Sequence, residues 1–250
     1  QTAVAGAAVL VIGAAAVTVL ARGGSPDDPP RPTSPPPPPV AAAPAGLTLT
    51  FTTEQRGDQG ITYTAVVPHA TGGDERITKV LDASLARPIL GYVTRFAATN
   101  AATLAPLTGR TVLTTSARLV RRTDGYLSIR YGFTPAGTAA QHASWWQPQS
   151  AVFDLRTGKL LTASGIYRPQ TLRKAGLGRV TALLNGTART SDPLCATDLQ
   201  IVDALALRTY LPMFTETGVR YEWGRCRPFA IAYERMRNVL RPEILKGFGD

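Results

Sequence analysis

Few residues in this chain are of types that support acid–base chemistry. Its two histidines, His69 and His142, stand in no pattern with a nucleophile and an acid. The motifs G-x-S-x-G, H-E-x-x-H and G-x-G-x-x-G and a phosphate-binding Walker loop are all missing from the sequence. Asp124 and Asp154 are the carboxylates that a glycosidase pair would need, but aspartates at turns and strand ends are usually structural. We therefore expect a protein that is not an enzyme, with no catalytic residue and no cofactor.

A cluster of polar and aromatic residues is the first candidate for a binding site. Gln141-His142-Ala-Ser-Trp145-Trp146 lies in a predicted loop between two strands. An exposed tryptophan in an exported protein can stack on a sugar ring or anchor a protein ligand. The alternative is that Trp145 and Trp146 both pack under the loop, while His142 makes a structural hydrogen bond.

Basic residues form the second candidate. The formal net charge is +10, and the stretch 118–179 carries +8 of it, because only Asp124 and Asp154 oppose ten basic residues. Outside a membrane such a charge attracts anionic cell-wall polymer or lipid headgroups. Nucleic acid is not expected as the partner of these basic residues, because the domain is predicted to be exported. We single out Arg121, Arg122 and Arg173 as binding residues; the alternative is that these arginines are solvated strand faces. The ten residues are Arg118, Arg121, Arg122, Arg130, Arg156, Lys159, Arg168, Arg173, Lys174 and Arg179.

The chain contains two cysteines, Cys195 and Cys226. An even count in an exported domain favours a disulfide between them, which the chain-entropy model values at about 3.5 kcal/mol. A metal site is not expected, because these cysteines and the two distant histidines lack ligand spacing.

The N-terminal sequence indicates export. Residues 3–21 form an apolar run without an ionisable residue, and a helix of this length spans roughly 28 Å, close to the thickness of a bilayer core. Residues 22–46 are rich in proline and predict a stiff polyproline tether. We expect a transmembrane helix over residues 1–21, with a cytoplasmic piece upstream of Gln1, a disordered tether over 22–46 and an extracytoplasmic domain over 47–250. The alternative is a signal peptide cleaved near Ala21, which would give a secreted protein.

The domain is predicted to be α+β, with a mainly antiparallel sheet packed with helices. Alternating patterns predict strands over 47–51 and over 61–67, where Pro68 ends the second one. A helical period follows over 74–98, with a kink at Pro88 and one apolar face. A hairpin joins 111–121 to 126–133 across Asp124-Gly125. The remaining expected elements are strands over 151–155, 211–214, 219–223 and 229–233, and helices over 169–184 and 234–245.

Two stretches of the domain carry a family resemblance. Ala140-Gln-His142 and Ser150-Ala-Val-Phe-Asp-Leu-Arg-Thr-Gly-Lys159 match an H…F-D-l-x-T-G-k signature, and the later strand pair Phe214–Tyr221 with Phe229–Leu240 matches its second part. The domain resembles the extracytoplasmic family shared by the anti-sigma factor RsiV, whose outer part binds lysozyme, and by secreted mycobacterial antigens of the MPT type. This resemblance implies a binding domain without an active site.

We therefore expect a membrane-tethered extracytoplasmic domain that binds or senses a component of the bacterial cell envelope. The high ratio of arginine to lysine and the abundant alanine are typical of a GC-rich genome, as in actinobacteria. Two alternatives remain open: the outer sensor part of an anti-sigma factor of the lysozyme-binding type, and an accessory domain of a cell-wall hydrolase or deacetylase.

Overall fold

The computed structural model describes residues 46–107, 109–137, 139, 148–191, 207, 211–222 and 227–249, which all belong to one compact unit. The predicted transmembrane helix, the tether, His142, Trp145, Trp146, Cys195 and Cys226 lie outside the described residues. In the described part of the chain, no helix is both long and apolar enough to cross a bilayer.

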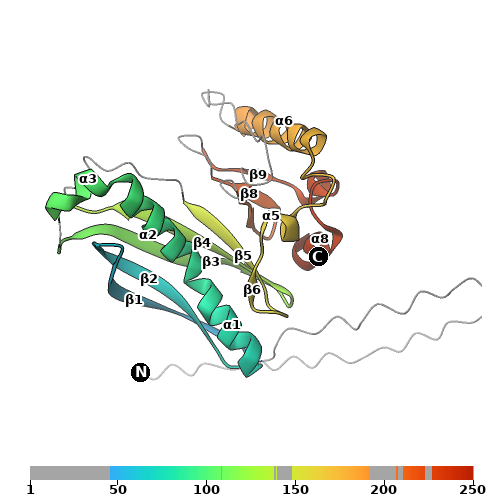
Figure 1. Cartoon of the computed structure of the whole chain (residues 1–250). Coiled ribbons are helices and arrows are strands. Elements are labelled where there is room, and N and C mark those ends of the chain that lie inside the picture. Colours follow the sequence, from blue (N-terminus) through green and yellow to red (C-terminus); the bar gives the residue numbers. More distant parts are fainter. Residues whose placement is uncertain are drawn as a thin grey trace, which may run out of the picture. The chain divides into compact units, whose positions relative to one another are not determined.

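The domain is α+β, as predicted, and is built on a curled sheet with the strand order β1-β2-β3-β4-β5-β6 (Figure 1). All neighbours are antiparallel except β2 and β3, which run parallel. The connection between these two strands carries the helices α1, α2 and α3 and a short 3₁₀ turn, η1, as a parallel pair requires. The bounds are β1 (Thr48–Asp58), β2 (Ile61–Thr71), α1 (Glu75–Leu85), α2 (Arg87–Thr99), α3 (Ala101–Leu104), η1 (Ala105–Leu107), β3 (Thr111–Arg122), β4 (Tyr126–Pro135), β5 (Gln149–Asp154) and β6 (Lys159–Leu160).

The helices α1 and α2 cover one face of this sheet. The Asp74 carboxylate caps α1 by accepting a hydrogen bond of 3.0 Å from the backbone N–H of Ile77. The helical period predicted over 74–98 forms two helices, because the chain breaks at Ala86, two residues before the predicted kink at Pro88. Pro88 lies in the first turn of α2, where a backbone N–H has no acceptor within the helix, so its absence from proline loses no hydrogen bond. The apolar face predicted for this stretch is not fully buried, since Val80 and Leu90 are more than one-third exposed.

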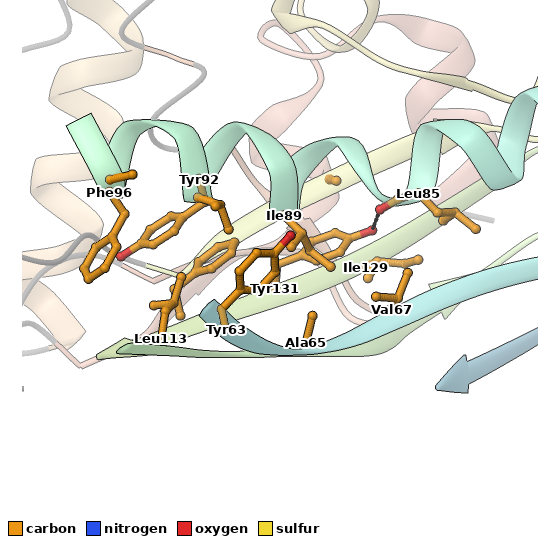
Figure 2. Packing of buried hydrophobic residues seen from close by; sticks show 14 of the residues in the cluster. Tyr63, Ala65, Val67, Leu85, Ile89, Tyr92, Phe96, Leu113, Ile129 and Tyr131 are labelled. Atoms are coloured by element: carbon orange, nitrogen blue, oxygen red, sulfur yellow. Dashed lines mark hydrogen bonds between the residues drawn. The ribbon is translucent and has the colours of Figure 1, made fainter. Parts of the chain in front are cut away.

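A first hydrophobic core lies between these helices and the sheet. Figure 2 shows the helix side chains meeting those of the strands. The rings of Tyr92 and Phe133 stack with their centroids 3.7 Å apart. Alternate residues of each strand contribute, as a strand period of two dictates. The buried side chains labelled in Figure 2 are Tyr63, Ala65, Val67, Leu85, Ile89, Tyr92, Phe96, Leu113, Ile129 and Tyr131.

A second core forms where the C-terminal third packs against the other face of the sheet (Figure 1). Ser128 of β4 marks this contact, because its hydroxyl accepts a hydrogen bond of 3.2 Å from the backbone N–H of Phe214. A small antiparallel sheet, β7-β8-β9, confirms the predicted strand pair around Glu216-Thr-Gly218. The elements here are α5 (Ala163–Ile166), α6 (Lys174–Ser191), β7 (Met213–Phe214), β8 (Val219–Tyr221), β9 (Phe229–Ile231), η2 (Tyr233–Met236) and α8 (Pro242–Gly249).

Several predicted boundaries are wrong. Strand β1 continues to Asp58, beyond the predicted end at Phe51. Strand β2 continues through Pro68, which is tolerated because β3 pairs with β2 only at residues 62–65 and leaves that edge open. Helix α6 runs through Gly186, because Leu184 and Ala188 are buried on its core side. The predicted helix over 234–245 is a 3₁₀ turn followed by a separate helix that begins at Pro242.

Buried tyrosines make this fold sensitive to alkali. The Tyr131 hydroxyl donates a hydrogen bond of 2.9 Å to the carbonyl oxygen of Leu85, and burial raises its pKa well above the ordinary value of 10.0. Burial also raises the pKa of Tyr221 to about 12. Above pH 10 the unfolded chain ionises while the folded one does not. Stability is therefore full below pH 10 and falls as the pH rises towards the raised pKa values.

We expect the unfolding free energy to fall above pH 10 by up to about 1.4 kcal/mol per pH unit for each such tyrosine. Tyr131→Phe should cost about 1 kcal/mol at pH 8 and flatten the alkaline slope. Urea denaturation at several values between pH 8 and pH 12 measures both effects. A slope that is identical in wild type and variant would contradict this account of Tyr131.

Candidate functional site

The described residues enclose an open pocket with a volume of about 420 Å³. It lies between the turn from β5 to β6, the short helix α5 and the start of α8. The turn carries the F-D-x-x-T-G sequence of the family signature. The lining residues are Tyr126, Asp154, Arg156, Thr157, Lys159, Leu160, Leu161, Thr162, Ser164, Gly165, Arg241 and Glu243.

Strand alternation positions the first wall of the pocket. Phe153 is fully buried in the first core, so its neighbour Asp154 faces the opposite side of the sheet, where the pocket lies. The chain then reverses in a tight turn, closed by a hydrogen bond of 2.8 Å from the N–H of Gly158 to the carbonyl oxygen of Asp154. Gly158 has a φ of +69° and lies against the backbone of α1 near Ile77 and Leu81. This contact fixes the turn on the helix.

An ion pair rigidifies this wall. The Asp154 carboxylate accepts two hydrogen bonds from the guanidinium of Arg156, at 2.9 and 2.8 Å. The same guanidinium donates to the Tyr126 hydroxyl at 3.0 Å and lies 5.3 Å from the centre of that ring. The Asp154 hydrogen bond raises the pKa of Arg156, so its charge is permanent. Burial raises the pKa of Tyr126, which therefore stays neutral at physiological pH.

The opposite wall begins with α8. Arg241 donates to the carbonyl oxygen of Ser164 at 2.7 Å and to the Glu243 carboxylate at 3.1 Å. Hydrogen bonding to its own backbone N–H at the helix start lowers the pKa of Glu243. Lys159 completes the set of charges. Its side chain is exposed and makes neither a hydrogen bond nor an ion pair with any described residue, so the pocket keeps one uncompensated positive charge.

A basic surface adjoins the Arg241 wall. The segment 168–174 is joined to the segment 234–243, because Arg168 donates its backbone N–H to Val239 and its side chain to the carbonyl oxygen of Leu240, at 3.0 and 2.8 Å. We call these two segments the basic junction. Its basic residues exceed its two acidic ones, Glu234 and Glu243, by four. They are Arg168, Arg173, Lys174, Arg235, Arg237 and Arg241.

The three arginines predicted to bind a ligand lie in different settings. Arg121 is half-buried and bonds to the carbonyl oxygens of Thr215 and Phe248, so it joins β3 to the C-terminal third. Arg122 donates to the carbonyl oxygen of Leu47 at 2.8 Å. Arg173 is exposed in the basic junction. The structure therefore does not bring the three together, and of these only Arg173 lies in the basic junction.

His69 has partners that the sequence did not predict. Its Nδ1 lies 3.3 Å from the Asp82 carboxylate and its Nε2 lies 3.2 Å from the Glu54 carboxylate. Hydrogen bonds, first of all from Arg56, lower the pKa of Glu54 to about 2. A carboxylate lies within hydrogen-bond distance of each ring nitrogen. His69 therefore joins β1, β2 and α1, and neither nitrogen is free to contact a substrate. No group of three or more metal-ligating side chains occurs in the described ranges.

Tyr126, Arg241 and Glu243 are among the pocket residues that were not predicted from the sequence. The sequence did contain a signal for Arg241 and Glu243. Arg-Pro-Glu at 241–243 is a typical helix start, with Pro at the first position and an acidic residue in the first turn. Tyr126 could not have been found, because its hydroxyl reaches Arg156 only through the pairing of β4 with β5.

Comparison with solved structures identifies neighbours of this fold. A member of the DUF3298 family from Bacteroides fragilis NCTC 9343 superposes with a TM-score of 0.51 at 12% identity, over 83% of this chain and 98% of that chain. The two proteins share a fold. A DUF3298 family protein from Pseudomonas aeruginosa PAO1 gives a TM-score of 0.46 at 13% identity, over 79% of this chain and 95% of that one. No family model matches the sequence, and no curated protein matches it.

Proposed function

We propose that this chain is a membrane-tethered, extracytoplasmic and non-catalytic domain that binds an anionic polymer of the bacterial cell envelope. The pocket and the basic junction form its binding surface. The observation that carries the proposal is the unpaired ammonium of Lys159, held in a pocket beside a surface of excess positive charge. The apolar run and the proline-rich tether of the sequence support a location outside the cytoplasm.

The charges of the site suit recognition of an extended anion. Arg156 and Arg241 are each held by a carboxylate, so they shape the pocket, while Lys159 and the exposed residues of the junction supply free charge. Exposed charges attract an anion over a Debye length of about 8 Å at physiological ionic strength. A polymer with repeated phosphate or carboxylate groups can contact the pocket and the junction together.

Two features support a binding role over catalysis. Both carboxylates of the pocket pair with arginines, and the lowered pKa of Glu243 makes it a poor proton donor at neutral pH. Neither a histidine nor a cysteine is among the residues that line the pocket. Among the described lining residues, the hydroxyl groups therefore have no histidine beside them to act as a general base.

A second candidate function is the outer sensor part of an anti-sigma factor that binds lysozyme. Its support is the fold shared with a DUF3298 member, together with the RsiV-like signature at 150–159. Lysozyme is a basic protein, and a basic domain repels it during approach. This repulsion favours the anionic polymer as the ligand.

The experiment that tests the proposal measures pelleting of the full chain, in detergent solution, with purified cell wall. We expect binding at low salt that weakens steeply at high salt, because the attraction comes from exposed charges. Parallel arms use anionic lipid vesicles and immobilised lysozyme. Absence of binding to cell wall, or tight salt-insensitive binding to lysozyme, would contradict the proposal.

A further inference from the structure

Among the described residues, strand β1 leaves one long edge of the sheet without a partner. It is the first strand in the sheet order and pairs only with β2, and no described element lies beyond it in Figure 1. It has 11 residues, and its register with β2 is continuous from Thr48 to Asp58. Natural edge strands are usually short, bulged or protected by Pro or Lys. β1 is long and continuous and contains no Pro or Lys, and its charged residues are Glu54, Arg56 and Asp58.

The hairpin geometry determines which backbone groups point outward. Gln59 and Gly60 join β1 to β2 with φ values of +53° and +76°, the signature of a two-residue type I′ turn. Such a turn closes on a hydrogen-bonded pair, Asp58 with Ile61. Because an antiparallel ladder alternates, the even-numbered residues of β1 bond to β2. The odd-numbered residues direct their N–H and C=O groups to the free edge.

The side chains of this strand are complementary to those of an identical strand. In an antiparallel pair with its two-fold axis at Gln55, Glu54 lies opposite Arg56 of the partner subunit, and the same ion pair repeats across the axis. Thr52, whose hydroxyl donates to Glu54 at 2.9 Å, lies opposite Asp58 of the partner subunit. Thr53 lies opposite Gly57 of the partner subunit. In this register no like charges oppose each other.

Exposure of the participating residues agrees with this pairing. The side chains of Glu54 and Arg56 keep about one-third of their surface exposed, although they already form an ion pair of 2.8 Å with each other. Thr52, Thr53 and Gln55 are exposed as well. Four threonines in 11 residues give β1 strong strand propensity, although none of its side chains is fully buried.

We propose that the free edge of β1 pairs with β1 of a second copy of this chain, antiparallel and with the two-fold axis at Gln55. The two sheets then become one continuous sheet. Any extended peptide could use the backbone groups, but the charges of Glu54-Gln55-Arg56 are complementary to those of the same segment read in reverse, which favours an identical strand over an unrelated one. The pairing is independent of the pocket and of the basic junction.

The first test compares two lysine variants of the full chain in density-matched detergent by sedimentation velocity. Gln55→Lys sets two ammonium groups opposite each other and should raise the dimer dissociation constant about tenfold or more. Thr53→Lys faces Gly57 of the partner subunit and should leave the constant nearly unchanged. Both side chains are exposed, so both variants should unfold at the same urea concentration as wild type.

The second test uses charge complementation. Glu54→Arg alone and Arg56→Glu alone each set like charges opposite one another, so each should be monomeric. Mixed together, the two variants should form a heterodimer, because every opposed pair is then complementary. A wild-type chain that stays monomeric up to about millimolar concentration, a mixture that does not associate, or equal effects of Gln55→Lys and Thr53→Lys would overturn the proposal.

Discussion

Gly158→Ala should lower the unfolding free energy by about 3 kcal/mol, one of the largest effects of a single methyl group in this domain. A Cβ at this position would lie 2.4 Å from the carbonyl oxygen of Ile77 and 2.7 Å from the backbone nitrogen of Leu81. Both atoms belong to the backbone of α1 and cannot move alone. The φ of +69° adds its own strain.

Gly60→Ala is the matched control. Gly60 also has a positive φ, +76°, but a Cβ there would meet no atom within 4 Å. We expect a loss of about 1–2 kcal/mol, the cost of the backbone conformation alone. Urea denaturation of both variants measures the difference. Equal losses would show that the turn at Gly158 does not depend on its contact with α1.

Arg121→Met should lower the unfolding free energy by about 2–3 kcal/mol. The guanidinium donates to the carbonyl oxygen of Thr215 at 2.7 Å and to that of Phe248, and it lies 6.0 Å from the centre of the Phe248 ring. Methionine keeps the packing of the aliphatic stem but removes the bonds between β3 and the C-terminal third. The loss should be visible in urea denaturation of the full chain.

The matched control for this variant is Arg118→Met on the same strand. Arg118 is exposed and bonds to no described residue, so we expect a change within about 0.5 kcal/mol. Comparing the two variants also distinguishes a structural role of Arg121 from a role in ligand binding. If Arg121→Met unfolds at the wild-type urea concentration but binds cell wall more weakly, Arg121 is a ligand residue and its structural role is refuted.

The sequence predicted the fold class and most strands because these depend on local patterns. The Asp124-Gly125 hairpin is an example, since β3 and β4 pair across it as predicted. Errors arose where a tertiary contact decides the outcome. Helix α6 passes Gly186 because the residues around it are buried, and β2 passes Pro68 because its neighbour strand has ended.

The candidate site was less predictable. The F-D-x-x-T-G turn was identified as part of a signature, but the partners that make it a pocket come from α5 and α8, which are distant in sequence. Basic residues were grouped by their position in the chain, although several of them are bonded to carbonyl oxygens or carboxylates. Arg121, Arg130 and Arg168 are of this kind. Charge counted along a sequence cannot distinguish bonded arginines from free ones.

The free charge of the pocket and of the basic junction is proposed to bind an anionic envelope polymer. The most direct test is the dissociation constant of the full chain for purified cell wall at low salt, measured for wild type, Lys159→Glu and the matched control Arg95→Glu. Arg95 is exposed on α2, in the helix layer on the other face of the sheet. We predict that Lys159→Glu raises the constant about tenfold, while Arg95→Glu changes it less than about twofold. Equal effects of the two variants would contradict the account, because binding would then follow net charge and not this site.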